Sequence, residues 1–247
     1  MRLSCLAILT VCVGALHGAD EKLPRADAII DRYIEVTGGS AAYDGRKNEM
    51  TRVTMEIVGQ NIKAAMVKYD ALPNKSYSVV DLPGAGKIEQ GSDGDVVWER
   101  SAMQGPRVKS GDERLQYLRG TNLRAQAHWR DHYKNPELAG VEVVNGEACY
   151  KVTLTASDGK PEIRWYGRKS GLLVKSEIVV KNPMGDITAE VTAGDYKKTP
   201  GGIMMPHTIR QKVLGREMVF TILEVKENDD LPKDRFEIPA DVKALLN

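Results

Sequence analysis

The sequence predicts a mainly β protein with some α-helix, in which a curved antiparallel sheet of about eleven strands is covered on its inner face by helices. Three observations lead to this fold class. Short segments of alternating apolar and polar residues, separated by Gly, Pro, Asn and Asp, recur along most of the chain, as is typical of strands joined by turns. Helical spacing is confined to two regions, so the alternation of strands and helices that makes a parallel sheet is missing. The 247 residues show neither an internal repeat nor a linker and predict one domain.

The first 19 residues have the pattern of a secretory signal peptide. Met1-Arg2 precedes an apolar run over 3–16, and small residues precede Asp20. The run is shorter than the roughly 20 residues of a membrane-spanning helix. Cleavage after Ala15 and cleavage near Ala19 both fit the sequence, and we expect a start near Asp20. The prediction is therefore a leader over 1–19, one domain over 20–247, a periplasmic or secreted location and no transmembrane segment.

Cysteine usage agrees with a mature protein that has no internal disulfide. Cys5 and Cys12 lie inside the predicted leader, which leaves Cys149 as the one cysteine of the mature chain. The bulky Val11 before Cys12 argues against a lipid-modified N-terminus.

An amphipathic helix is predicted over 24–37. Ile29, Ile30, Tyr33 and Ile34 recur at helical spacing. Pro24 suits the first turn of a helix, and the glycine pair at 38–39 ends it.

Strands are predicted after this helix, where apolar residues begin to recur at every second position. In the first of them, from Met50, the side chains of Val53, Met55 and Ile57 share one face. Further strands are predicted at 62–69, 76–82, 87–90 and 96–100, and the turns between them favour an antiparallel meander.

A helical interruption is predicted in the middle of the chain, over 112–119 and 123–134. Trp129 and Tyr133 are four residues apart and share a face of the second helix. A helical pair between two runs of strands must bury its apolar stripe on the sheet, so we expect this segment to form a lid over the inner face.

Alternation resumes at about Val141 and continues to the C-terminal region. Strands are predicted at 149–156, 162–168, 172–181, 186–195, 203–214 and 217–227.

The motifs searched for catalytic chemistry do not predict an enzyme or a cofactor. His128 and His132 have the spacing of two metal ligands on a helix, but the glutamate of H-E-x-x-H is missing and a solvated helix face is favoured over a metal site. Cys149 opens an alternating strand and is expected to be packed. Carboxylate pairs lie in turns, where turn formation explains them.

Charge and apolar patterning favour a ligand held by apolar contact. The 35 basic and 34 acidic residues leave a net charge of +1 with no long run of either sign, so no nucleic acid is expected as a partner. Nine methionines and two phenylalanines indicate that flexible thioethers fill apolar space. His207 lies on the apolar side of its strand, where either a cavity-facing group or a hydrogen-bonded structural histidine is possible. The candidate lining of an apolar pocket is Met55, Met66, Trp98, Trp129, Tyr133, Trp165, Met205, His207 and Met218.

Four segments together resemble the outer-membrane lipoprotein-sorting superfamily. They are Asp93-Gly94-Asp95-Val96-Val97-Trp98-Glu99, the hairpin Ser170-Gly171-Leu172-Leu173, the stretch from Asp195-Tyr196 to Pro206-His207, and the closing 228–239 with Phe236-Glu237-Ile238-Pro239. The likeness to LolA-like and LolB-like carriers covers nearly the whole mature chain. It implies an incomplete β-barrel with helices on its concave side and an apolar cavity for the acyl chains of a lipid or lipoprotein. The arginine that holds the lid of such carriers closed has no match here, because Arg52 lacks the flanking motif.

The expected function is that of a non-catalytic, periplasmic carrier or binding protein for acyl chains, with a lipid or an acylated lipoprotein as partner. Burial of each methylene is worth roughly 0.8 kcal/mol, so apolar fit alone can supply the affinity. Two alternatives stay open: a protein-interaction module that binds an envelope protein, and a metal-dependent hydrolase centred on His128 and His132.

Overall fold

A computed structural model describes residues 23–181 and 185–246 of the chain. The predicted leader over 1–19 lies outside the described residues. Among the helices of the described part, none has the length and apolar character needed to cross a membrane.

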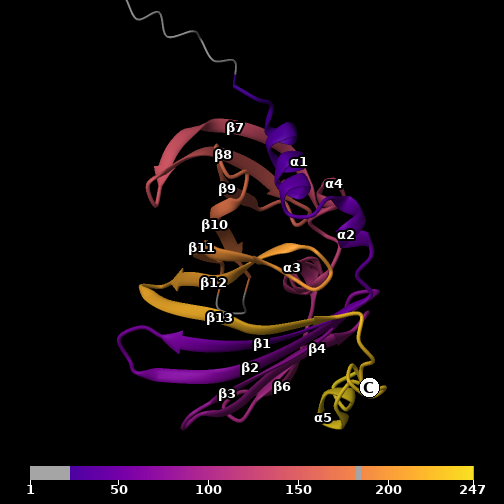
Figure 1. The fold of residues 1–247 in the computed structure, drawn as a ribbon. Helices are drawn as coiled ribbons and strands as arrows, with labels where there is room; N and C mark the ends of the chain where they lie inside the picture. The colour runs from indigo at the N-terminus through magenta and orange to yellow at the C-terminus, as the bar shows by residue number, and fades with distance from the viewer. Residues whose placement is uncertain (1–22, 182–184, 247) are drawn as a thin grey trace, which may run out of the picture.

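One antiparallel sheet dominates the structure, as the sequence predicted. Within the described residues it has 13 strands in the order β6-β5-β4-β3-β2-β1-β13-β12-β11-β10-β9-β8-β7. Its two edges do not pair, so the sheet is an incomplete barrel that curves around the helices (Figure 1). The strands are β1 Asn48–Ile57, β2 Ile62–Ala71, β3 Lys75–Leu82, β4 Gly86–Asp93, β5 Val97–Ser101, β6 Gly105–Lys109, β7 Tyr133–Val144, β8 Glu147–Ala156, β9 Pro161–Gly167, β10 Leu173–Val180, β11 Ile187–Lys198, β12 Met204–Val213 and β13 Arg216–Glu227.

The pairing of β1 with β13 determines the path of the chain. It joins the first strand to the last, with Met55 opposite Phe220 and Ile57 opposite Met218. The chain therefore starts in the middle of the sheet, steps by hairpins to the edge at β6, and resumes at the opposite edge with β7. The connection between the two edges carries α3 Gly111–Thr121 and α4 Trp129–His132 across the concave face (Figure 1).

The N-terminal helix α1, Ala26–Val36, forms the main core with the β7–β9 end of the sheet. Ile30 is 1% exposed, and the Tyr33 ring lies 5.6 Å from that of Tyr166 on β9. The helix ends at glycines with φ of +135° and +76°, where the absence of a Cβ permits the left-handed turn into the short α2, Ser40–Asp44. The buried members of this core are Ala26, Ile29, Ile30, Tyr33, Ile34, Tyr43, Trp129, Tyr150, Val152, Leu154, Tyr166 and Ile203.

The prediction of a second helix over 123–134 is wrong. Only Trp129–His132 is helical, and Tyr133 begins β7, opposite Ala156 of β8. Asn135 has a φ of +50° and precedes Pro136, and a residue before proline is biased away from the helical conformation. Trp129 and Tyr133 therefore do not share one helix face.

The estimate of about eleven strands was also low. The predicted strands do not include β6, a five-residue edge strand that contains Pro106 and starts at a glycine with φ of +69°. Proline has no N–H to donate and occurs in sheets mainly on edge strands, so a short strand of this composition resembles a loop.

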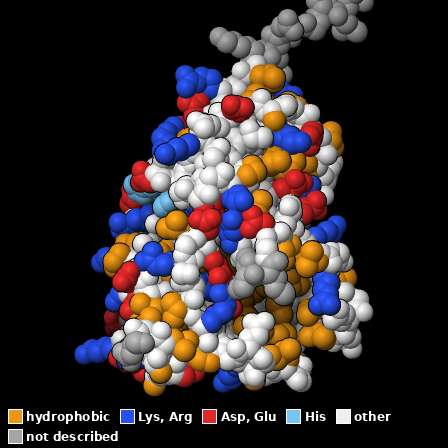
Figure 2. All heavy atoms as spheres, turned by 180° about the vertical axis from the view of Figure 1, so that it is seen from behind, with side chains coloured by type: hydrophobic (Ala, Val, Ile, Leu, Met, Phe, Trp, Pro, Cys, Tyr) orange, Lys and Arg blue, Asp and Glu red, His pale blue; other side chains and the backbone are white. Residues whose placement is uncertain are grey.

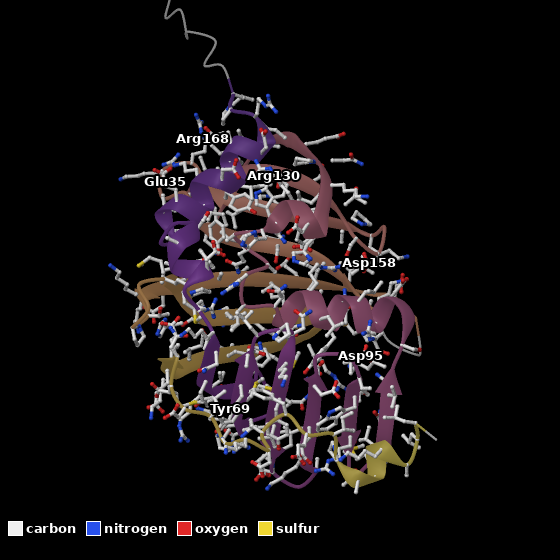
Figure 3. All side chains as sticks on the ribbon, turned by 90° about the vertical axis from the view of Figure 1, so that its right-hand side faces the viewer. Glu35, Tyr69, Asp95, Arg130, Asp158 and Arg168 are labelled. Atoms are coloured by element: carbon white, nitrogen blue, oxygen red, sulfur yellow. The ribbon has the colours of Figure 1, made fainter. Side chains whose placement is uncertain are left out.

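The C-terminal segment covers the outer face of the β1–β5 half, opposite the face that carries the helices. The Arg235 guanidinium lies 4.5 Å from the ring of Tyr69 and 5.5 Å from that of Tyr77. Val242 of α5, Ala240–Lys243, is fully buried. Figure 3 shows Tyr69 beside this segment at the lower end of the molecule.

We predict that the core under α1 sets the stability of the fold. Leu154→Ala removes a side chain that is 2% exposed, so the free energy of unfolding should fall by about 2–5 kcal/mol in urea titrations followed by circular dichroism. The matched control, Leu223→Ala, changes a leucine that is 65% exposed and should stay within about 0.5 kcal/mol of the native protein. Equal losses in the two variants would contradict this placement of the core.

Candidate ligand-binding cavity

A cavity of about 640 Å³ lies between α3 and the strands β9–β11 on the concave face. Its volume is within the range of small-molecule sites, which runs from about 300 to 1,000 Å³. One wall is apolar and the other carries charged and amide groups. The apolar and aromatic lining is Tyr33, Tyr117, Ala125, Tyr133, Leu173, Ile178, Val180 and Val191, and the charged lining is Lys109, Glu113, Arg119, Glu162, Arg164 and Lys181.

Polar contacts hold α3 in place over the cavity. Gln116 donates from Nε2 to the carbonyl oxygen of Val179 at 2.5 Å and accepts from the backbone N–H of Lys181 at 2.9 Å. The Tyr117 hydroxyl lies 3.1 Å from Ser76 Oγ on β3. Thr121 is the one residue of this helix that is buried. A helix held in this way, with little apolar burial, belongs to the less stable part of a structure.

An arginine that the sequence analysis did not identify ties the connection after α3 to the sheet. Arg46, in the link from α2 to β1, donates from Nη1 to the carbonyl oxygen of Leu123 at 3.1 Å. Its guanidinium also pairs with Glu49 on β1 and lies 3.6 Å from Glu227 on β13. The Arg46, Glu49 and Glu227 side chains are all less than a tenth exposed. Loss of the arginine would leave buried carboxylates without their cation, a change that typically destabilises strongly.

Two arginines and a tyrosine meet in the charged part of the cavity. The Arg164 guanidinium lies 4.4 Å from the centre of the Tyr133 ring, and that of Arg119 lies 5.5 Å from it. Arg164 Nε donates to Glu162 Oε1 at 2.7 Å. Burial alone would lower the pKa of Arg164, but the Glu162 carboxylate raises it well above its ordinary value, so the guanidinium stays charged. Burial raises the pKa of Tyr133, which keeps its hydroxyl protonated.

An apolar surface continues from the cavity across the middle of the sheet. Residues paired across neighbouring strands point to the same face of the sheet. Ala193 pairs with Ile209, Ile209 with Phe220, and Phe220 with Met55, so all four lie on the concave face. Ile209 and Phe220 are partly exposed on it. Met218 lies opposite Ile57, and Met66 lies opposite Val53, on this face as well. Three of the four methionines predicted as cavity residues thus lie on the concave face.

The other predicted lining residues lie in several places. Tyr133 is among the residues that line the cavity. Trp129 is 3% exposed and belongs to the core under α1, where its Nε1 donates to Asp31 at 3.0 Å. Met205 lies opposite Lys197 of β11, and the Nδ1 atom of His207 is 3.1 Å from the Met205 carbonyl oxygen, as a structural histidine would be.

Trp98 and Trp165 lie on the outer face, because they alternate with residues that face the helices. Trp165 stands between Arg164 and Tyr166, and its Nε1 donates to Glu142 Oε2 at 2.8 Å. Trp98 lies opposite Gly91, where a Cβ would come within 2.8 Å of the indole ring. The C-terminal segment forms a pocket with Trp98 on that face. Both tryptophans are buried, and the inward direction expected for them is wrong.

The histidine pair does not gather a ligand set. His128 Nε2 lies 2.7 Å from Asp44 Oδ1, and His132 ends the single turn of α4. Within residues 23–181 and 185–246 there is no group of three or more His, Cys, Asp or Glu placed to hold a metal ion. Cys149 is buried, and this burial raises its pKa, so the thiol is a packed group as expected.

Charges of both signs are mixed on one face of the molecule. Figure 2 shows basic and acidic side chains interspersed on the face turned away from the view of Figure 1, with hydrophobic side chains between them. That face shows no extended patch of one sign.

Comparison with solved structures identifies the fold. A LolA superfamily protein from Nitrosomonas europaea has a TM-score of 0.59 and 17% sequence identity, and the match covers 87% of this chain and 99% of that one. A DUF1329 family protein from Desulfovibrio piger has a TM-score of 0.58 and 16% identity, with 87% and 98% covered. A domain of Vibrio parahaemolyticus named for outer membrane lipoprotein sorting has a TM-score of 0.55 and 13% identity, with 90% and 99% covered. No family model and no curated protein matches the sequence. The LolA-like fold is thus confirmed.

We predict that partial burial of His132 makes stability depend on pH. Burial lowers the pKa of His132 below its ordinary value of 6.5, so the unfolded chain binds more protons than the folded one just below that pH. The free energy of unfolding should therefore fall as the pH drops from 7.5 through 6.5. His132→Gln should lose less stability between pH 7.5 and pH 5.5 than the native protein, as measured by urea unfolding at the two values. Identical losses would show that His132 does not contribute.

Proposed function

We propose that the protein binds acyl chains in the cavity beneath α3 and acts as a lipid or lipoprotein carrier of the cell envelope. The observation that supports this most directly is a cavity of about 640 Å³ with an apolar wall, closed by a helix that is held mainly by polar contacts. An apolar wall gains free energy from each methylene that it removes from water. A helix with little apolar burial can move aside at modest cost to admit a chain.

The continuation of the apolar face supports a long ligand. From Leu173 and Val191 in the cavity, the same face leads over Ile209 and Phe220 to Met55. An extended chain that enters under α3 would have apolar contacts beyond the cavity itself. Methionine side chains on that surface adapt to ligands of different shape. The names of the similar proteins from Nitrosomonas europaea and Vibrio parahaemolyticus agree with such a role in lipoprotein handling.

An interaction module is the second candidate, because one edge of the sheet is open to a partner. Within the described residues β7 is the last strand of the sheet and pairs only with β8. Val143 on this strand is 74% exposed. A strand of a partner protein could pair with such an edge. We rank this second because the cavity is already formed and has an apolar wall, whereas the edge would need a partner strand to complete it.

We further propose that residues 1–19 are a leader and that residues 20–247 form the carrier domain. When the full gene is expressed in a Gram-negative host, the periplasmic product should begin near Asp20 and titrate for a single thiol, that of Cys149. N-terminal sequencing and thiol titration after unfolding test this. A product that starts at Cys12 and carries acyl groups would contradict it.

The carrier function is tested by a charge placed on the apolar wall. Ile178→Asp puts a carboxylate into the cavity, where it opposes apolar burial, and should weaken binding of a fluorescent C16 fatty acid by at least about 10-fold. The matched control is Val179→Asp, the next residue of β10, whose side chain points to the opposite face. The control should bind within about 2-fold of the native protein. Equal affinities for all three proteins, or no binding by the native protein, would overturn the proposal.

A further inference from the structure

The charges of the cavity are not balanced between the two signs. Its lining contains four basic residues, Lys109, Arg119, Arg164 and Lys181, and two acidic ones, Glu113 and Glu162. Charged groups are costly to keep in a cavity unless they have partners. The partners of each basic group therefore decide which of them can bind a polar end of a ligand.

Two of the four basic groups are fully engaged by carboxylates of the protein. Lys109 Nζ lies 2.6 Å from Glu99 and 3.2 Å from Glu113. Lys181 Nζ lies 3.1 Å from Asp186 and 3.4 Å from Asp112. Lys109 at the end of β6 thus joins α3 to β5, and Lys181 just after β10 joins α3 to that end of the sheet, so both act within the scaffold of the cavity.

Arg119 and Arg164 are less completely paired. A guanidinium has five N–H donors. Arg164 donates to Glu162 at 2.7 Å and to the Tyr166 hydroxyl at 3.5 Å. Arg119 donates to Ser157 Oγ at 3.2 Å, and its Nη2 lies 3.6 Å from Asp158 Oδ2, a fully buried oxygen for which the described residues provide no hydrogen-bond partner. Figure 3 shows Asp158 in the β8–β9 hairpin, on the side of the sheet where α3 lies.

The common contact with Tyr133 brings the two guanidiniums to one place. Both lie within 5.5 Å of the centre of its ring. Stacking on an aromatic ring fixes the plane of a guanidinium and leaves its edge free to bind in two-pronged fashion to a carboxylate or phosphate. The apolar wall of Leu173, Ile178 and Val180 lines the same cavity. An anionic group and an apolar chain could therefore be bound together.

We propose that the ligand of the cavity is an anionic amphiphile, whose carboxylate or phosphate binds Arg119 and Arg164 while its chain lies along the wall of β10 and β11. This inference rests on the proposed acyl-chain binding and adds the chemistry of the head group. Arg119 and Arg164 are binding residues that select charge, and Tyr133 is the residue that positions them.

The test compares probes that share a chain and differ in charge, by isothermal titration calorimetry on the native protein. Hexadecanoate and hexadecyl phosphate carry the two anionic groups, hexadecan-1-ol carries none, and acetate and inorganic phosphate lack the chain. We expect at least one of the anionic C16 probes to bind about 10-fold or more tightly than hexadecan-1-ol, and the chain-free anions to bind far more weakly. The better of the two anionic probes distinguishes a fatty-acid type from a phosphate type of ligand.

Variants of the arginine assign the effect to this site. Arg119→Gln should weaken binding of the anionic C16 probe by about 10-fold and change hexadecan-1-ol by less than about 2-fold. The matched control is Arg130→Gln, which alters an arginine that also stacks on an aromatic ring, Trp129, but pairs with Asp31 outside the cavity. It should leave all affinities unchanged. If Arg119→Gln does not fold by circular dichroism, Arg119→Lys keeps the charge without the planar fork, and a loss that is smaller but still specific to the anionic probes is expected.

The possible outcomes separate this inference from the function on which it rests. Equal affinity for hexadecanoate, hexadecyl phosphate and hexadecan-1-ol would overturn the anionic head group and leave acyl-chain binding intact. Acetate or phosphate binding as tightly as the C16 anions would overturn the amphiphile. Failure of every C16 probe to bind would overturn both the inference and the proposed function.

Discussion

The pairing of β1 with β13 is the constraint on which the rest of this structure depends. In a simple meander, where the strands lie in sequence order, the first and last strands would form the two edges of the sheet. Here the first and last strands meet in the middle, so the free edges are β6 and β7, which are consecutive in the sequence. The residues between them have to cross the whole width of the sheet, and the concave side is where they do so (Figure 1). The position of α3 over the cavity is thus a consequence of strand order.

Two kinds of packing divide the concave face. Beneath α1, apolar and aromatic side chains are nearly fully buried, as Ile30, Leu154 and Tyr166 show. Beneath α3, contacts run through Gln116, Tyr117 and ion pairs such as that of Arg107 with Glu113. Apolar burial is cooperative over many neighbours, whereas partly buried polar contacts can be exchanged for contacts with water. The first region is suited to hold the fold, and the second to open.

Much of the fold follows from local sequence patterns, and the main errors have physical causes. Alternation of period two identified most strands, because each has one face against the helices or the C-terminal segment and one face closer to solvent.

The same pattern does not say which of the two faces points toward the helices. In β9 the apolar Ile163 and Trp165 suggest an inward face, yet Glu162, Arg164 and Tyr166 line the helix side. Because long lysine side chains cover Trp165 on the outer face, a buried aromatic on either side gives the same signal. Arg164 was not predicted as a cavity residue for this reason. The helix predicted over 123–134 is wrong because residues spaced four apart gave no sign of the turn at Asn135-Pro136.

The open edges of the sheet also affect how thick a ligand the concave face can accommodate. In a closed barrel, strand number and stagger fix the diameter, so the interior accepts a narrow range of sizes. A sheet whose margins at β6 and β7 are not bonded to each other has no such fixed circumference. Small changes in twist, distributed over its 13 described strands, would be enough to change its curvature. For the proposed amphiphile, the length of the concave face and the charge at one end would then set selectivity, while ligands of different thickness, such as one, two or three parallel chains, would fit.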